Sequence, residues 1–179
     1  MKRKIIYGLG ALLIATVTLG AVANGPYYAL PAWAQKLACA ASSNCPRFIV
    51  LADWNSEAVL DRETGLVWER SPSTTAFTWI DARNQCASRT TGERKGWRLP
   101  SVHELGSLID PTHSDPALSS GHPFLTVQSS IYWSATISAD PTRGPAWGVL
   151  FSDGQVGDGL KSPSNLIWCV RGNMDADQY

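Results

Sequence analysis

Five side chains that could hold a metal ion or move a proton lie close together in the middle of the chain: His103, Asp110, His113, Asp115 and His122. Two histidines and a carboxylate are enough ligands for zinc, and carboxylate oxygens in a loop suit calcium. No two of these histidines stand four residues apart, the spacing that places both on one face of a helix. We therefore predict no metal site and no cofactor.

Serine, histidine and aspartate, the residue types of a nucleophilic triad, are all present. The chain has no Gly-x-Ser-x-Gly sequence, which would place a serine nucleophile on a sharp turn between a strand and a helix. We therefore assign no catalytic residue and expect a protein that is not an enzyme.

Tryptophans are numerous, and most of them fall in predicted strands, where large aromatic side chains usually pack in the core. Trp133 and Trp147 are nearest to the predicted loops. They are the candidates for stacking on a sugar ring.

Basic side chains are the other candidate ligand-binding residues. Arg89, Arg94 and Lys95 cluster in a predicted turn and could contact sulfate or phosphate through charge-assisted hydrogen bonds. A solvated turn without a ligand is the alternative. Arg143 and Lys161, in two later loops, are further candidates.

Residues 1–23 have the pattern of a secretory signal peptide: a basic head, an uncharged apolar run and the sequence Ala21-Val22-Ala23. An uncleaved membrane anchor is the alternative, although the apolar run is shorter than the roughly 20 residues of a membrane span. We predict cleavage near Ala23, a secreted or periplasmic protein, and no membrane contact after cleavage.

Charge argues against a nucleic-acid partner. Without the basic head, 12 basic residues stand against 15 acidic ones, whereas nucleic-acid-binding modules are usually basic. A local basic patch remains open.

Four cysteines remain after export, and an even number in an exported chain indicates disulfides. Four cysteines allow three pairings. We predict Cys39–Cys45, which closes a small loop, and Cys86–Cys169, which joins a helix to the last strand. A reactive or metal-binding thiol pair is the alternative, but no Cys-x-x-Cys spacing supports it.

The stretch 96–105 carries the clearest local signals. Trp97 and Leu99 alternate with a polar residue, which predicts a short extended piece, and the following proline delays the helix. Ser101 and Glu104 form a capping box for a helix that we expect to run through Ile109. Arg98 is expected to pair with a carboxylate, either Asp61 or Glu104.

A second helix is predicted at 79–88, capped by Thr78 and Asp81, with Cys86 facing the core. Strands are predicted at 47–52, 58–61, 65–69, 131–136, 146–152, 155–156 and 166–171, and loops at 111–130, 138–145 and 157–164. The order predicts an α+β domain over residues 47–172, with two helices packed on short antiparallel sheets. Residues 24–46 are expected to be a linker with the small cysteine loop, and 173–179 a flexible tail.

Several motifs occur in the order seen in the Lcl C-terminal domain family, which the chain resembles over roughly residues 57–172. They are Asp61, Thr64 to Trp68, Cys86, Gly96 to Pro100, Glu104-Leu105, Tyr132 to Thr136, Ala146-Trp147 and Cys169 to Arg171. The resemblance implies a C-type-lectin-like fold, in which a disulfide commonly ties the first helix to the last strand. The Gly-Trp-Arg-Leu-Pro sequence is also similar to formylglycine-generating-type domains.

The name-giving member of this family is a bacterial surface adhesin, and its C-terminal domain is associated with sulfated-polysaccharide binding. The collagen-like stalk of that adhesin has no counterpart here, because the chain has no Gly-x-y repeat. Nor does the chain have the Glu-Pro-Asn or Trp-Asn-Asp triplets of calcium-dependent lectins.

These observations predict an exported binding module that recognises a glycan or an envelope partner through its loops, with no prediction of oligomeric state. The alternatives are an enzyme on the formylglycine-generating-type fold and a structural subunit of an envelope complex. Free thiols would favour the enzyme.

Overall fold

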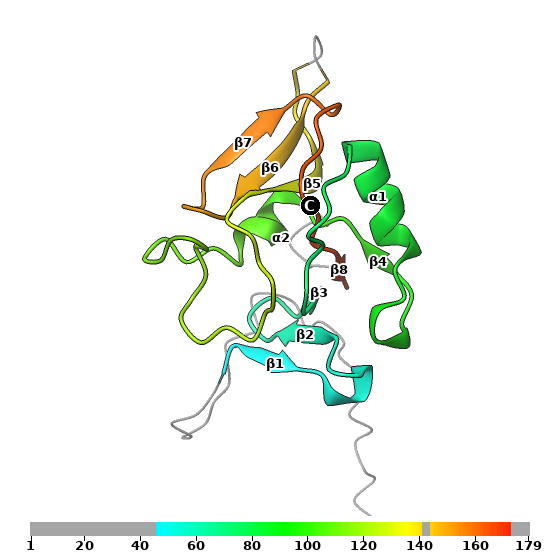
Figure 1. Cartoon of the computed structure of the whole chain (residues 1–179), viewed down its shortest axis with the longest axis vertical. Coiled ribbons are helices and arrows are strands. Elements are labelled where there is room, and N and C mark those ends of the chain that lie inside the picture. Colours follow the sequence, from blue (N-terminus) through cyan, green and yellow to red (C-terminus); the bar gives the residue numbers. More distant parts are fainter. Residues whose placement is uncertain (1–45, 141–143, 173–179) are drawn as a thin grey trace, which may run out of the picture.

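The computed structural model describes residues 46–140 and 144–172. These residues form two α-helices and two antiparallel sheets, so the predicted α+β class is confirmed (Figure 1). The predicted signal peptide, the linker with Cys39 and Cys45, the candidate Arg143 and the tail after Gly172 lie outside the described residues. Within the described part of the chain, no helix has the length and apolarity of a membrane span.

The larger sheet has the strand order β1-β2-β3-β8-β4. Its strands are β1 (Phe48–Val50), β2 (Ala58–Asp61), β3 (Val67–Glu69), β4 (Trp97–Arg98) and β8 (Val170–Arg171). The strands predicted at 58–61 and 65–69 are confirmed as β2 and β3, which pair as an antiparallel hairpin, with Val59 opposite Trp68. The last strand, β8, lies between β3 and β4, so the C-terminal end of the domain is an inner strand of this sheet and not an edge strand.

The smaller sheet has the order β5-β6-β7, with β5 (Ile131–Ile137), β6 (Ala146–Leu150) and β7 (Val156–Gly159). The predicted loop at 157–164 is therefore wrong over residues 157–159, which pair with β6 as part of β7. Glycine and aspartate are poor strand formers, but the ladder is made by backbone groups, and the turn at Asp153-Gly154 aligns them. Of the strand predicted at 166–171, only Val170 and Arg171 form a regular strand, β8. Leu166 forms an isolated bridge to Tyr132.

Helix α1 (Trp79–Ser88) has the predicted bounds, and the Thr78 hydroxyl accepts a hydrogen bond from the Asp81 backbone N–H. Helix α2 (Val102–Gly106) has the predicted capping box between Ser101 and Glu104 but ends three residues before Ile109. The Ser107 hydroxyl donates to the Glu104 carbonyl oxygen at 2.7 Å, which competes with continuation of the helix. The backbone then continues in tighter turns.

Two apolar clusters form the core. One contains Trp54, Trp79, Trp97 and Trp133 on the side of α1, and the other contains Trp68 and Trp168 between the two sheets. Trp68 and Trp168 meet edge to face, with ring centroids 5.8 Å apart. Most of the described tryptophans therefore pack in the core, including Trp54 and Trp79, which lie in helical segments and not in strands.

Three carboxylates are buried in the described residues, and each is paired with an arginine. Arg47 pairs with Asp61, Arg89 with Glu69, and Arg98 with Glu104. Of the two partners considered for Arg98, the structure selects Glu104. A buried carboxylate is costly unless it is paired and hydrogen-bonded, so each pair fixes the chain around it.

Glu69 joins four segments of the chain. Its Oε1 accepts a hydrogen bond from the Thr91 hydroxyl at 2.9 Å and lies 3.2 Å from Nε of Arg89. Its Oε2 accepts from the backbone N–H of Cys169 at 3.2 Å. Burial raises the pKa of Glu69, although Arg89, Thr91 and Cys169 each act in the opposite direction.

Cys86 and Cys169 form the predicted disulfide, which joins α1 to the segment that leads into β8. The two cysteines are 83 residues apart in sequence, and both are fully buried. The disulfide therefore joins helix α1 to the C-terminal segment of the domain inside the apolar cluster on the side of α1.

Replacing both cysteines with serine is expected to lower the free energy of unfolding by about 4 kcal/mol, because a long loop in the unfolded chain is no longer closed. Urea denaturation of the double variant against the oxidised wild type measures this. Wild-type protein unfolded with and without a reductant is the control. A difference below about 1 kcal/mol would contradict the expected role of the bond.

Glu69→Gln tests the buried carboxylate. The pKa of Glu69 in the folded state is raised above 4.5, so the unfolded chain loses this proton at a lower pH than the folded chain does. The free energy of unfolding of the wild type therefore falls as the pH rises from the unfolded-state pKa to the folded-state pKa. Glutamine cannot ionise, so the stability difference should shift in favour of the variant between pH 4.5 and 7. Urea denaturation across that range measures it, and parallel profiles for the two proteins would be the contrary result.

Candidate functional site

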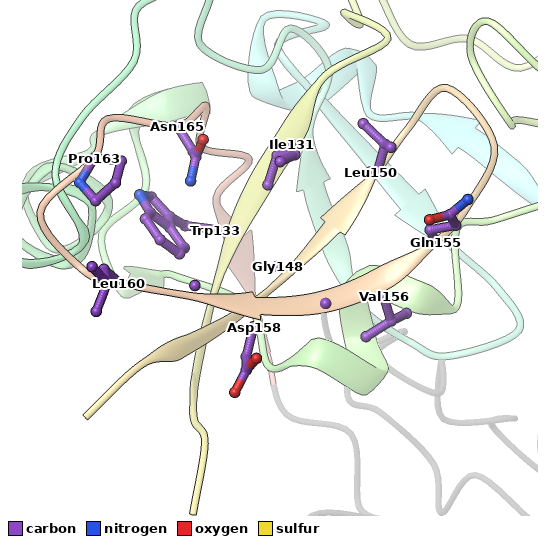
Figure 2. Close-up of a pocket in the computed structure, with 12 residues that line it drawn as sticks. Ile131, Trp133, Gly148, Leu150, Gln155, Val156, Asp158, Leu160, Pro163 and Asn165 are labelled. Carbon is purple, nitrogen blue, oxygen red and sulfur yellow. The ribbon is translucent and has the colours of Figure 1, made fainter. Parts of the chain in front are cut away.

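A groove of about 360 Å³ crosses one face of the smaller sheet (Figure 2). Its volume is at the small end of the range for ligand pockets, roughly 300–1,000 Å³. The groove is lined by β5, β6, β7 and the segment that follows β7, through Ile131, Trp133, Gly148, Leu150, Gln155 to Leu160, Pro163 and Asn165.

Glycines form the floor of this groove. Residues directly opposite in an antiparallel ladder share a face, so Gly148 and Gly157 lie on the same face as Trp133. A Cβ added at Gly157 or Gly159 meets no atom within 4 Å, whereas one at Gly148 comes within 2.9 Å of the Tyr132 carbonyl oxygen. The positions on β7 are therefore open toward the groove, and Gly148 allows β5 and β6 to approach closely.

The walls are mainly apolar. Ile131 and Leu150 stand at one end, and Leu160 and Pro163 stand near Trp133 at the other. Gln155 and Asn165 add one carboxamide at each end. Asp158 is the one ionisable residue among those that line the groove, and its side chain points away to the other side of β7 (Figure 2). The groove has features of a binding surface and none of an acid–base site.

The three predicted loops do not converge on one face. Of the predicted loop at 138–145, the described residues 138–140 and 144–145 lie at the end of the sheet where Ile137 pairs with Ala146. The loop at 111–130 reaches the opposite end, where the Asp115 and Ala117 backbone N–H groups donate to the carbonyl oxygens of Ser152 and Phe151 at 2.9 and 2.7 Å. A ligand that meets all three loops at once is not consistent with this arrangement.

The two candidate tryptophans lie in different places. Trp133 lines the groove, but it is only 2% exposed, and its indole N–H donates to the Phe77 carbonyl oxygen at 2.9 Å. Trp147 is partly exposed and shares the other face of the sheet with Asp158. The structure therefore does not bring these two rings together.

Lys161 follows the groove but turns toward α1. Its ammonium nitrogen lies 4.3 Å from the centroid of the Trp79 ring, and Arg83 lies 5.0 Å from the same ring. The backbone N–H of Trp79 also donates to the Lys161 carbonyl oxygen at 3.1 Å. These contacts hold the segment after β7 against the start of α1, where it forms a wall of the groove.

Arg94 and Lys95 belong to a cationic cluster beside the larger sheet, in the segment between η3 and β4. The guanidinium groups of Arg94 and Arg171 lie 5.4 and 5.3 Å from the centroid of the Trp54 ring. Nε of Arg171 donates to the Lys95 carbonyl oxygen at 2.9 Å. Trp54 lies in η2 (Ala52–Trp54), and Arg94 directly follows η3 (Thr91–Glu93).

Arg89, which the sequence groups with Arg94 and Lys95, is instead held by the buried Glu69. Both line a polar cleft of about 800 Å³ with several serines and threonines. The other charged groups of this cleft hold backbone: Arg70 donates to the Pro123 and Ser56 carbonyl oxygens, and Glu57 accepts from the Gly92 N–H. We therefore interpret the charged groups of this cleft as structural.

Three of the five titratable residues in the middle of the chain, Asp110, His113 and His122, make local contacts. Asp110 accepts hydrogen bonds from the Thr112 hydroxyl and backbone N–H, which hold its pKa below the usual value. His113 lies 3.1 Å from Asp110. Burial lowers the pKa of His122, whose ring lies beside Phe124. Among the residues that the structure describes, no three His, Cys, Asp or Glu side chains are grouped to hold a metal ion.

One feature of these sites was not found from the sequence, and a second was found only in part. The glycine floor was missed, although it has a local signal, the Gly157-Asp158-Gly159 alternation that begins three residues after the Asp153-Gly154 turn. Arg94 and Lys95 were grouped from the sequence, but Trp54 and Arg171 are far from them in the chain and meet them only in the folded protein.

Comparison with known proteins identifies the family. The profile of the Lcl C-terminal domain family matches residues 57–171, a range that contains both helices, the disulfide and every described strand except β1. No curated protein matches the chain. Because the matched range covers more than half of the sequence and agrees with the motifs at Gly96 to Pro100 and Cys169 to Arg171, this chain belongs to the Lcl C-terminal domain family.

Proposed function

We propose that this protein is an exported, non-enzymatic binding module that recognises an anionic glycan through Arg94, Lys95 and Arg171. The observation that carries the proposal is the pair of guanidinium groups, those of Arg94 and Arg171, over the Trp54 ring, with the Lys95 backbone bonded to Arg171. The N-terminal pattern of residues 1–23 supports export to the periplasm or the cell exterior.

We also propose that the domain is C-type-lectin-like. Two features support this: the helices precede the antiparallel β5-β6-β7 sheet in the chain, and a disulfide ties the first helix to the segment before the last strand. Because the disulfide joins the first helix to the C-terminal segment, the domain is a rigid scaffold, and such a scaffold is suited to present a binding surface to a ligand.

The cluster suits sulfate or carboxylate groups on a polysaccharide. Arg94 and Lys95 are exposed, and Arg171 is partly exposed, so their donors reach solvent. A guanidinium group stacked on an aromatic ring is held in one plane and loses less freedom when it binds an oxyanion. Because the chain without its basic head has more acidic than basic residues, the cluster would be a local attraction and not part of a generally basic surface.

An oxidase of the formylglycine-generating type is less well supported. That chemistry needs free, reactive cysteines, whereas both cysteines in the described residues, Cys86 and Cys169, are joined and buried. A subunit of an envelope complex remains the second candidate, because the apolar groove on the smaller sheet is suited to a protein partner.

The double substitution Arg94→Ala and Lys95→Ala is expected to weaken binding to heparin at least tenfold, because two charge-assisted hydrogen-bond donors are lost, each contributing roughly 1.5 kcal/mol or more. Isothermal titration calorimetry at two salt concentrations measures the affinity for heparin and its salt dependence. Both should be smaller for the double variant than for the wild type. Arg83→Ala is the matched control, since Arg83 also stacks on a tryptophan, but on Trp79. Equal losses in the control and the double variant, or heparin binding that neither affects, would refute the proposed site.

A further inference from the structure

We propose that the free edge of β7 and the adjacent groove form a docking site for an extended segment of a protein partner, which adds to the smaller sheet as a fourth strand. The partner segment would carry apolar residues on the groove side and a basic residue on the other side, opposite Asp158. The proposal concerns a different face from the cationic cluster and does not rest on the proposed glycan binding.

The hydrogen-bonding pattern leaves backbone groups of β7 directed outward. The Leu150 N–H donates to the Gln155 carbonyl oxygen at 2.8 Å, which makes this a hydrogen-bonded pair. Antiparallel pairs alternate, so Gly148–Gly157 and Ala146–Gly159 are also hydrogen-bonded pairs. The N–H and C=O groups of Val156 and Asp158 therefore point away from β6.

The two edges of this sheet differ. The edge at β5 is covered, since the Trp133 N–H donates to the Leu166 carbonyl oxygen and the Leu166 N–H donates to that of Ile131. Among the described residues, Val156 to Gly159 form no comparable backbone hydrogen bonds beyond the ladder with β6. All four residues of β7 are exposed, so its outer edge is accessible to another strand.

The glycines of β7 indicate close approach by another group. Glycine inside a strand costs about 0.5–1 kcal/mol relative to alanine and often marks a place where a ligand or another backbone comes near. Gly157 and Gly159 both leave the groove side of β7 without side chains and with open space above it. Side chains from an added strand would fill this space between Leu150 and Leu160.

The exposed apolar surface around the groove favours a protein segment over a small ligand. Ile131 and Leu160 line the groove and are 41% and 49% exposed, and Val156 is 52% exposed on the other face of β7, so an added strand would find apolar side chains on both faces. Contiguous exposed apolar surface often marks a protein interaction site. Strand addition combines backbone hydrogen bonds with pockets for alternate side chains, and β7 offers both.

Asp158 sets the charge of the partner. Its carboxylate lies on the face opposite the groove, beside Trp147, and forms no ion pair with another described residue. A lysine or arginine opposite it on the added strand would form a cross-strand pair, while an acidic residue would be repelled. The negative charge also disfavours pairing with a second β7 edge, which carries the same carboxylate.

The test uses the oxidised protein and a library of end-blocked heptapeptides in which apolar residues alternate with lysine, and a matched library with glutamate in place of lysine. Fluorescence polarisation measures binding. Lysine peptides should bind and glutamate peptides should not. If no lysine peptide binds better than its scrambled version, the proposal is overturned.

Asp158→Pro removes the outward N–H without removing a hydrogen bond to β6, and should weaken the selected peptide at least tenfold. Asp158→Ala keeps the N–H and removes only a surface charge, so a loss of about fivefold or less is expected. Gly157→Leu should fill the groove and abolish binding, and Gly106→Leu, which also adds a side chain in open space but on α2, should not. Equal effects of proline and alanine at residue 158 would overturn strand addition.

Amide hydrogen exchange of the wild-type protein gives a second readout that does not depend on any variant folding. The Val156 and Asp158 amides should become protected when the peptide is added. Protection confined to other residues would overturn the proposal. Heparin binding should be unchanged by Asp158→Pro, which separates a failure of this site from a failure of the cationic cluster.

Discussion

The pairing of Arg98 with the buried carboxylate of Glu104 is the interaction on which the centre of the domain depends. Oε2 of Glu104 accepts hydrogen bonds from the Ser101 backbone N–H and from Arg98, both at 2.7 Å, so one carboxylate caps α2 and holds β4. Arg98 also donates to the Gly172 carbonyl oxygen, next to β8. Glu104 is fully buried, and an unpaired charge at this depth would cost several kcal/mol. The Arg98–Glu104 ion pair therefore holds the start of α2, strand β4 and the end of β8 together.

Local signals were enough to predict much of this scaffold. A helix cap requires a few residues at fixed spacing, so Thr78 and Ser101 marked the starts of α1 and α2 correctly. The β2–β3 hairpin follows from two short strand patterns separated by the Thr64-Gly65 turn, which is also a local signal. The pairing of Cys86 with Cys169 was also correct: it was predicted from the short spacing of the other two cysteines and from the position of Cys86 on the core-facing side of its helix.

The parts that were missed depend on contacts between distant segments or on backbone alone. Gly157 and Gly159 have no side chains to reveal a strand, and they form β7 only because β6 provides a ladder. The end of α2 was misplaced because a single hydroxyl, that of Ser107, competes for a helix carbonyl. The candidate Trp133 lies in the groove but is almost fully buried, which strand pattern alone does not distinguish from an exposed platform.

The central place of β8 has a consequence for how the molecule is made. Val170 and Arg171 are synthesised after every other strand, yet they lie between β3 and β4. Without these two residues, β4 has no strand that joins it to β3. Cys86 likewise cannot form its disulfide before Cys169, which lies 83 residues later in the chain. Assembly of the larger sheet therefore cannot be completed from the N-terminus onward, because its inner strand comes from the last residues of the domain.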